Sequence, residues 1–490
     1  MNSVILLSIV LFYFAVLLSI AFYTSRHSNN ESFFIGNRSS KWWLVAFGMI
    51  GTSLSGMTFI SVPGTVGSKG FDYFQVVIGY WLGYFAVAFI LLPIYYKMHL
   101  TSIYTYLERR LGAISYKTGS LFFILSRTLG ATLRLYLVIK VLEKFVLEGM
   151  GISFELTAVV ILGLILLYTF RGGVKTIVWT DTLQTTFMLL ALIVCVVYIM
   201  HSLHLDLAGT WSAMQAKGYT KFIQSDPKHS SFFLKQILGG AFITIAMTGL
   251  DQEMMQKNIS VSNLKDSQKN MITFCFTLLV ANFIFLLLGG LLYLYASANG
   301  ITATGDDLFP TIAMNSGLPF FITVCFLIGL VSAVFPSADG ALTALTSSFC
   351  IDILGMKRRT DIGEKQKSRT RLIVHNTFAL VFLICIFFFR RIDNGSLIQT
   401  LLVVAGYTYG PLLALFSFGI FTKRSVRNEF VPFICLISPI VCYILKQHDK
   451  EWLNGYCVGT ELLIINAGIA FVLLLLSSTK MAQVKSAENL

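Results

Sequence analysis

Long apolar runs are the feature of this 490-residue sequence that most restricts its fold. A helix needs about 20 apolar residues to cross a hydrocarbon core of roughly 30 Å. Runs of this kind lie at roughly 4–23, 43–63, 75–96, 119–146, 152–170, 182–201, 233–255, 271–296, 319–352, 371–390, 398–421, 428–446 and 460–477. They predict an all-α integral membrane protein with about 13 transmembrane helices, in a single domain over 1–490.

The composition agrees with a membrane protein. Hydrophobic residues make up 56% of the chain and charged residues 12%, and the mean hydropathy is +0.74. About a quarter of a soluble protein is charged. The net charge of +13 lies in short loops between the runs and not in one basic stripe, so no nucleic-acid partner is expected. We expect no obligate protein partner. The eight cysteines contain no Cys-x-x-Cys pair and predict neither a disulfide framework nor a zinc site.

Basic residues are unevenly divided between alternate loops. One set carries 24 lysines and arginines and the other carries 11. Basic loops stay in the cytoplasm, so the bias predicts an external N-terminus, a cytoplasmic C-terminus and an external segment 202–232. Lys257, Lys265 and Lys269 are counted in a cytoplasmic loop, whereas Arg390 and Arg391 fall on the opposite side. The first run lacks a preceding basic residue and a small-x-small cleavage site, so we interpret it as a retained helix.

Two apolar runs contain small and hydroxyl residues where leucine or phenylalanine would be usual. Residues 48–59 read Gly-Met-Ile-Gly-Thr-Ser-Leu-Ser-Gly-Met-Thr-Phe, and 332–348 are similar but include Pro336 and Asp339. Glycine weakens a helix, and an interrupted helix in a membrane frees carbonyls that can coordinate a cation. The alternative is a small-residue face that allows close helix packing.

Charged residues inside or beside apolar runs are the other candidates. Asp181 opens the run 182–201, where an acid is costly unless it has a role or a partner; a helix cap is the alternative. Arg127 and Arg134 lie seven apart on one helix face. They either meet an anionic ligand or pair with Asp181, Asp251 or Asp339.

Five segments together resemble the sodium/solute symporter family. They are 48–59, 101–110 (with Tyr-Leu-Glu-x-Arg), 171–184 (Gly-Gly followed by Trp-Thr-Asp), 248–252 and 332–348. The resemblance implies a LeuT-type fold with two inverted five-helix repeats, the first about 43–203 and the second about 234–421. One extra helix would precede the repeats and two would follow them.

The resemblance also implies binding sites. Sodium would be held by backbone oxygens of Gly51, Leu54 and Ala333 and by the hydroxyl of Ser337. Pro336 replaces a further hydroxyl, and by removing an N–H it frees the carbonyl of Ser332.

Two acids and several polar residues complete the implied sites. Asp181 and Asp339 would lie close together, where some members bind a second cation. Some members hold a substrate carboxylate with an arginine at the position of Gly130, one turn from Arg127 and Arg134. The expected solute-facing residues are Ser53, Ser55, Thr58, Tyr80, Arg127 and Arg134.

We therefore expect a sodium-coupled symporter that imports a small polar solute (a sugar, amino acid, carboxylate or sialic-acid-like molecule) across the cytoplasmic membrane by alternating access. Sodium would be the coupling ion, with no cofactor. The alternatives are proton coupling through Asp181 and Asp339, or a solute-binding membrane sensor. No nucleophile–base group or phosphate-binding loop indicates an enzyme.

Overall fold

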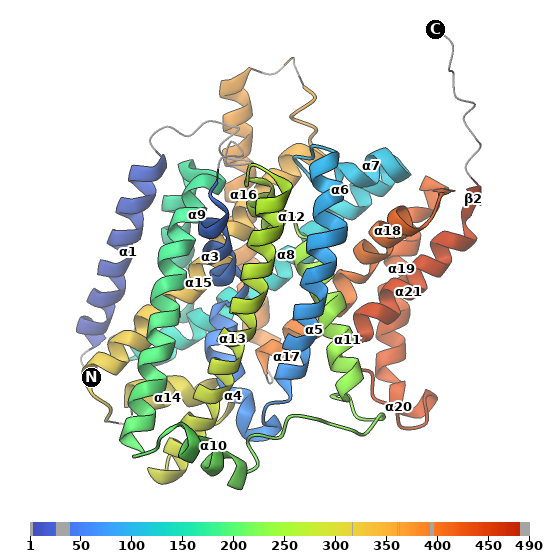
Figure 1. Ribbon diagram of the computed structural model, residues 1–490. Coiled ribbons are helices and arrows are strands. Elements are labelled where there is room, and N and C mark those ends of the chain that lie inside the picture. The colour runs from blue at the N-terminus through green and yellow to red at the C-terminus, as the bar shows by residue number, and fades with distance from the viewer. Residues whose placement is uncertain are drawn as a thin grey trace.

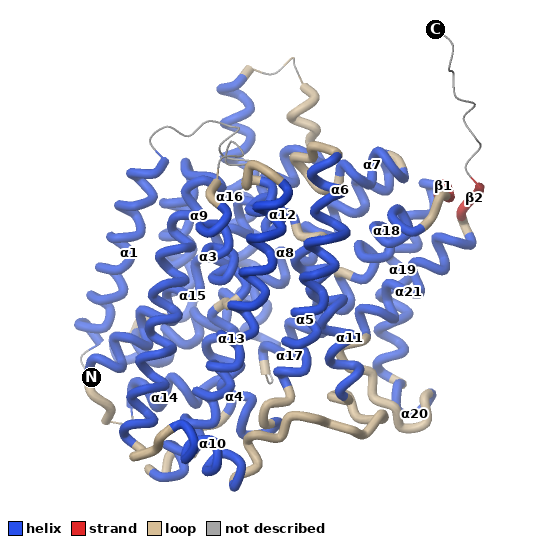
Figure 2. Tube along the Cα trace, in the orientation of Figure 1, coloured by secondary structure: helices blue, strands red, loops and turns tan. Residues whose placement is uncertain are grey.

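The computed structural model of the protein describes residues 3–25, 40–315, 317–359, 361, 363–392 and 396–480. Helices account for nearly all of its regular structure, and the short strands β1 (Arg424–Val426) and β2 (Ser478–Lys480) pair antiparallel (Figure 2). The α-helices are α1 (Ser3–Ser25), α3 (Trp42–Ser53), α4 (Gly56–Lys69), α5 (Tyr73–Ala86), α6 (Leu92–Lys97), α7 (Thr105–Leu111), α8 (Ala113–Leu142), α9 (Phe154–Ser202), α10 (Leu207–Ala216), α11 (Phe233–Thr244), α12 (Gln252–Ile259), α13 (Leu264–Ala298), α14 (Leu308–Asn315), α15 (Phe320–Ser348), α16 (Glu364–Ile392), α17 (Leu397–Thr408), α18 (Gly410–Phe421), α19 (Val431–Gln447), α20 (Asp449–Trp452) and α21 (Leu462–Leu476).

The helices have the lengths that a membrane requires. Among the described residues, eight helices are long and apolar enough to span a bilayer, and three bent helix pairs pass the same test together. Two shorter apolar helices lie at Phe154–Leu167 and Leu462–Leu476. The all-α, multi-pass membrane architecture is confirmed, whereas the count of 13 spans stays a prediction.

Three spans are broken in the middle. α3 and α4 meet at 56°, α11 and α12 at 64°, and α17 and α18 at 46°. The sequence predicts the first break but treats 233–255 and 398–421 as uninterrupted spans. A π-helical turn, Ile245–Gly249, precedes the second break. The third lies at Tyr409, just before Gly410 and Pro411, and proline cannot donate the next helical hydrogen bond.

The break between α11 and α12 has its exposed carbonyls satisfied by side chains. The Tyr95 hydroxyl donates to the Gly249 carbonyl and the Tyr104 hydroxyl to the Leu250 carbonyl, both at 2.8 Å. The Gln252 side chain accepts from the Ile103 amide at 2.9 Å. Two of the family-like segments, 101–110 and 248–252, therefore contact each other. Together they supply hydrogen bonds that hydrocarbon cannot.

One prediction about a loop is wrong. The spans expected at 152–170 and 182–201, with the Gly-Gly loop between them, are joined in the single helix α9. The side chains of residues 168 and 170–176 lie outside the described part. Two glycines disfavour a helix by about 2 kcal/mol in total, which is less than leaving several backbone groups without partners.

The short helices, strands and loops lie at the two ends of the helical bundle (Figure 1). α10 and α14 lie at the lower end, whereas α7, the start of α16 and the paired strands lie at the upper end. The loop groups that the charge analysis assigns to opposite sides of a membrane thus lie at opposite ends. Between them, the broken helices place irregular backbone in the middle of the helical bundle.

Candidate functional site

A polar pocket lies where the broken helices meet. Its walls come from the α3–α4 break, α5, α8, the α11–α12 region, α13 and α17. All six residues predicted to face the solute line it, although they come from four different helices: Ser53, Ser55, Thr58, Tyr80, Arg127 and Arg134. Further polar lining residues that the sequence analysis missed are Thr52, Tyr73, Tyr84, Thr244, Thr248 and Asn282.

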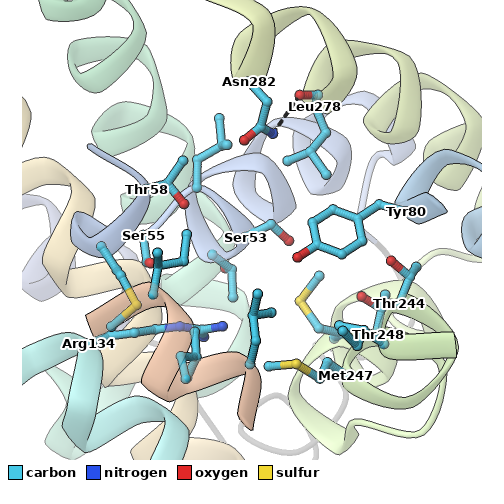
Figure 3. Close-up of a pocket in the computed structure, with 18 of the residues that line it drawn as sticks. Ser53, Ser55, Thr58, Tyr80, Arg134, Thr244, Met247, Thr248, Leu278 and Asn282 are labelled. Carbon is cyan, nitrogen blue, oxygen red and sulfur yellow. Dashed lines mark hydrogen bonds between the residues drawn. The ribbon is translucent and has the colours of Figure 1, made fainter. Parts of the chain in front are cut away.

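The pocket presents hydroxyls and one amide. Figure 3 shows the hydroxyls of Ser53 and Tyr80 turned toward the same space, with Arg134 entering from another helix. The Asn282 amide nitrogen donates to the Leu278 carbonyl at 2.8 Å, and its side-chain oxygen has no hydrogen-bond partner among the described residues. Such a surface is suited to a small solute that carries several hydroxyl or amide groups.

Arg134 is the cation of the pocket that no described acid neutralises. It forms no ion pair with a described residue, and its buried Nε lacks a hydrogen-bond partner there. Gly130, the position that the family resemblance suggested for a carboxylate-binding arginine, does not line the pocket. A partly buried arginine without an acid is costly, and an anionic ligand would remove that cost.

Arg127 is engaged differently, although it also lines the pocket. Its guanidinium pairs with Glu253 and lies 3.7 Å from an oxygen of Asp251. Asp251 also caps α12 by accepting from the amides of Glu253 (2.9 Å) and Met254 (3.2 Å). Of the alternatives left open by the sequence, this geometry matches the structural pair to Asp251. Glu253 is a partner that the sequence analysis missed.

The break between α3 and α4 leaves backbone oxygens without donors. Leu54 donates its amide to the Ile50 carbonyl and Phe59 donates to Ser55. Among the described residues, no such bond reaches the carbonyls of Gly51 and Leu54, which are the predicted backbone ligands for sodium. None of the described tyrosine hydroxyls donates to these two oxygens, in contrast to the break between α11 and α12.

The same break packs against α15, which carries the other predicted sodium ligands. A Cβ on Gly51 would lie 3.4 Å from Pro336, and one on Gly56 would lie 3.7 Å from Val334. The Ser337 hydroxyl donates to the Val334 carbonyl at 2.8 Å, which leaves its lone pairs available. Carbonyl and hydroxyl oxygens are the ligands that a hard cation prefers, so this donor set fits sodium.

Lys257 is not the loop charge that the sequence predicts. It lies in α12 and is 2% exposed. Its ammonium lies 2.7 Å from Oδ2 of Asp181, 2.6 Å from the Thr52 hydroxyl and 3.3 Å from Oε1 of Glu253. A reader of the sequence could have found a signal in the polar segment 251–258, which directly follows an apolar run.

The two predicted acidic ligands have distinct surroundings. Asp181 is fully buried, and its Oδ1 has no hydrogen-bond partner among the described residues. Asp339 is also buried, and it accepts from the Gly340 amide at 2.5 Å. Their close approach to each other, and sodium binding by either, stay predictions.

Comparison with known proteins identifies the family. The model of the sodium:solute symporter family matches residues 33–429. The chain belongs to this family. The protein is accordingly a sodium-coupled symporter of a small solute and not an enzyme, and sodium is its coupling ion.

Two relatives and one solved structure illustrate the similarity. The sodium/sialic acid symporter SiaT of Proteus mirabilis is 25% identical over 462 residues, covering 91% of this chain and 89% of its own. The sodium-coupled monocarboxylate transporter 1 of Mus musculus is 26% identical over 422 residues, covering 82% of this chain and 66% of its own. A solved Na+-coupled sialic acid symporter, substrate-bound and outward-open, matches with a TM-score of 0.82 at 20% identity, covering 97% of this chain and 99% of that one. The fold is therefore of the LeuT type.

The two pocket arginines should respond differently to loss of charge. Arg127→Met removes the buried guanidinium that pairs with Glu253 and lies beside Asp251, and loss of one partner of a buried ion pair costs about 3–5 kcal/mol. Arg134→Met removes a cation that has no described acid, so it should leave stability without solute unchanged or raise it. Thermal unfolding of the purified proteins without solute measures both. Equal destabilisation by the two substitutions would contradict the assignment of Arg127 to structure and Arg134 to the ligand.

Proposed function

We propose that this symporter imports a small carboxylate-bearing solute, with a sialic-acid-like sugar acid as the first candidate. The observation that carries the proposal is Arg134, a pocket arginine with no ion-pair partner among the described residues. Its planar fork can bind a carboxylate through two parallel hydrogen bonds. The relatives named above transport sialic acid and monocarboxylates by their names, and both kinds of solute carry a carboxylate.

The remaining pocket groups would bind the rest of the solute. Ser53, Ser55 and Thr58 present hydroxyls from the α3–α4 break, and Tyr80 presents one from α5. Hydroxyls both donate and accept, so they can bind the hydroxyl and amide groups of a sugar acid. A hydrocarbon acid without hydroxyl groups would leave most of these groups unpaired, which favours a polyhydroxylated solute over a simple fatty acid.

Sodium would bind between the α3–α4 break and α15. Its ligands in this proposal are the carbonyls of Gly51, Leu54 and Ala333 and the hydroxyl of Ser337, with the Ser332 carbonyl in place of the hydroxyl that Pro336 removes. Asp181 is left out of this site because its Oδ2 accepts from Lys257.

Sodium binding and solute binding would be coupled because both sites use the backbone of the α3–α4 break. Sodium would satisfy the carbonyls of the same break that carries Ser53 and Ser55, so it would order the residues that face the solute. A ligand shifts a conformational equilibrium by its preference for one state, and the ordered break would favour the state that binds solute. The membrane potential adds about 2.3 kcal/mol per charge for every 100 mV, which can drive uptake against a gradient.

We further propose that the protein lies in the cytoplasmic membrane with its N-terminus outside and its C-terminus in the cytoplasm. The asymmetry of loop charges supports this orientation. The membrane-sensor alternative is not favoured, because the chain belongs to a symporter family and the relatives named above are transporters. Proton coupling is not favoured, because the relatives named above are sodium-coupled.

The charge of the solute is tested with Arg134→Lys in proteoliposomes, using N-acetylneuraminate as the probe. Lysine keeps the charge but not the two-pronged geometry, so the apparent KM should rise about tenfold or more, corresponding to at least ~1.4 kcal/mol. Arg390→Lys, at an exposed position on α16, serves as a control and should not change KM. Unaltered uptake of an anionic solute by a well-folded Arg134→Ala variant would refute the proposal.

The sodium site is tested with Ser337→Ala. Loss of one ligand oxygen should raise the sodium concentration at half-maximal uptake several-fold, while Ser347→Ala on the same helix should not. Uptake under imposed sodium or proton gradients is the measurement. If a proton gradient drives uptake equally well without sodium, the sodium assignment fails and the proton alternative takes its place.

Orientation is tested by labelling single cysteines on intact cells with an impermeant reagent. Lys217→Cys, in the segment 202–232, should react, whereas Lys365→Cys, in the basic loop before α16, should react only after the cells are opened. Replacing the native cysteines first removes background labelling. The reverse pattern would invert the proposed topology.

A further inference from the structure

The Lys257 ammonium is held like a bound ion. It contacts oxygens from three elements: Asp181 on α9, Thr52 on α3 and Glu253 on α12. An ammonium has three N–H donors, so three acceptors satisfy it fully. Both the lysine and the aspartate are buried, and the 2.7 Å separation is that of a charge-assisted hydrogen bond.

The ammonium lies beside the proposed sodium site without belonging to it. Thr52 follows Gly51 directly in the chain, and a Cβ on Gly51 would lie 3.5 Å from the Asp181 carbonyl oxygen. A Cβ on Gly48 would lie 3.3 Å from the Asp181 side chain. α3 therefore packs directly against Asp181, and the two glycines allow this approach.

The oxygens around Lys257 form the kind of set that binds a monovalent cation. They comprise two carboxylates and one hydroxyl, and the second oxygen of Asp181 is unpartnered among the described residues. A hard cation needs several oxygens, so that single free oxygen is insufficient while the ammonium occupies the others. Removal of the ammonium would leave four oxygens around one buried space.

We propose that Lys257 is a built-in cation that takes the place of a second sodium at Asp181, so that this symporter binds one sodium ion. The inference rests on the proposed sodium site at the α3–α4 break, and it concerns a different position. A tethered ammonium remains in the protein when sodium leaves. It therefore neutralises Asp181 throughout the transport cycle without adding to the number of ions carried.

Two of the groups that contact Lys257 also connect it to the solute pocket. Thr52 accepts from the ammonium and lines the pocket. Glu253 links the same ammonium to Arg127, which also lines the pocket. The built-in charge thus positions residues on two sides of the solute cavity.

The test is the number of sodium ions bound by the purified protein, measured with radioactive sodium at equilibrium. The wild type should bind about one sodium per protein. Lys257→Ala should bind about two, because sodium can bind the oxygens that the ammonium no longer occupies. Lys265→Ala removes an exposed lysine at the start of α13 and should leave the number unchanged. The double variant Lys257→Ala/Asp181→Asn should bind about one sodium again, since it lacks the Asp181 carboxylate that would hold the second ion.

Stability provides the second readout. Lys257→Ala should be stable in sodium chloride and much less stable in choline chloride, because only sodium can replace the lost ammonium. If this variant does not fold in either salt while the double variant folds, sodium cannot replace the ammonium and the proposal fails.

The remaining outcomes separate this inference from the proposed sodium site. Two sodium ions on the wild type, or one on a folded Lys257→Ala variant, would overturn the role of Lys257. Absence of sodium binding by the wild type would instead refute the site at the α3–α4 break.

Discussion

Hydrocarbon offers no hydrogen bonds to a peptide group, and the organisation of this transporter depends on how its broken helices meet that constraint. At the break between α11 and α12, the hydroxyls of Tyr95 and Tyr104 cap the freed carbonyls. At the break between α3 and α4, the carbonyls of Gly51 and Leu54 have no such donors among the described residues. The carbonyls at the α11–α12 break thus have donors within the protein, whereas those at the α3–α4 break are suited to a cation.

The buried charges follow a corresponding division. Arg127 and Lys257 are both paired, and Glu253 joins them into one network that ties α8, α12, α9 and α3 together. Breaking such a network from one side is costly because the remaining charge stays buried. Arg134, in the same pocket, has no described acid. Arg127 and Lys257 thus stabilise the helix packing, and Arg134 is available for a ligand.

The limits of sequence reasoning are physical. Apolar runs and the weak helix at Gly51 could be predicted because span length and glycine content are local properties. The family resemblance brought together solute residues that do line one pocket. Pairings such as Lys257 with Asp181, 76 positions apart in the chain, could not be predicted, because a lysine after an apolar run looks like a loop charge. The break before α12 likewise depends on tertiary partners, Tyr95 and Tyr104, that the local sequence does not show.

The central claim is that sodium at the uncapped break orders a pocket that binds a carboxylate. The most direct test is the thermal shift caused by N-acetylneuraminate and by its methyl ester, each with sodium and with choline. A ligand that binds only the native state stabilises it by RT ln(1 + [L]/Kd). The account predicts a shift for the acid in sodium, a much smaller one in choline, and little for the ester in either salt. An equal shift for acid and ester, or for the acid in both salts, would contradict it.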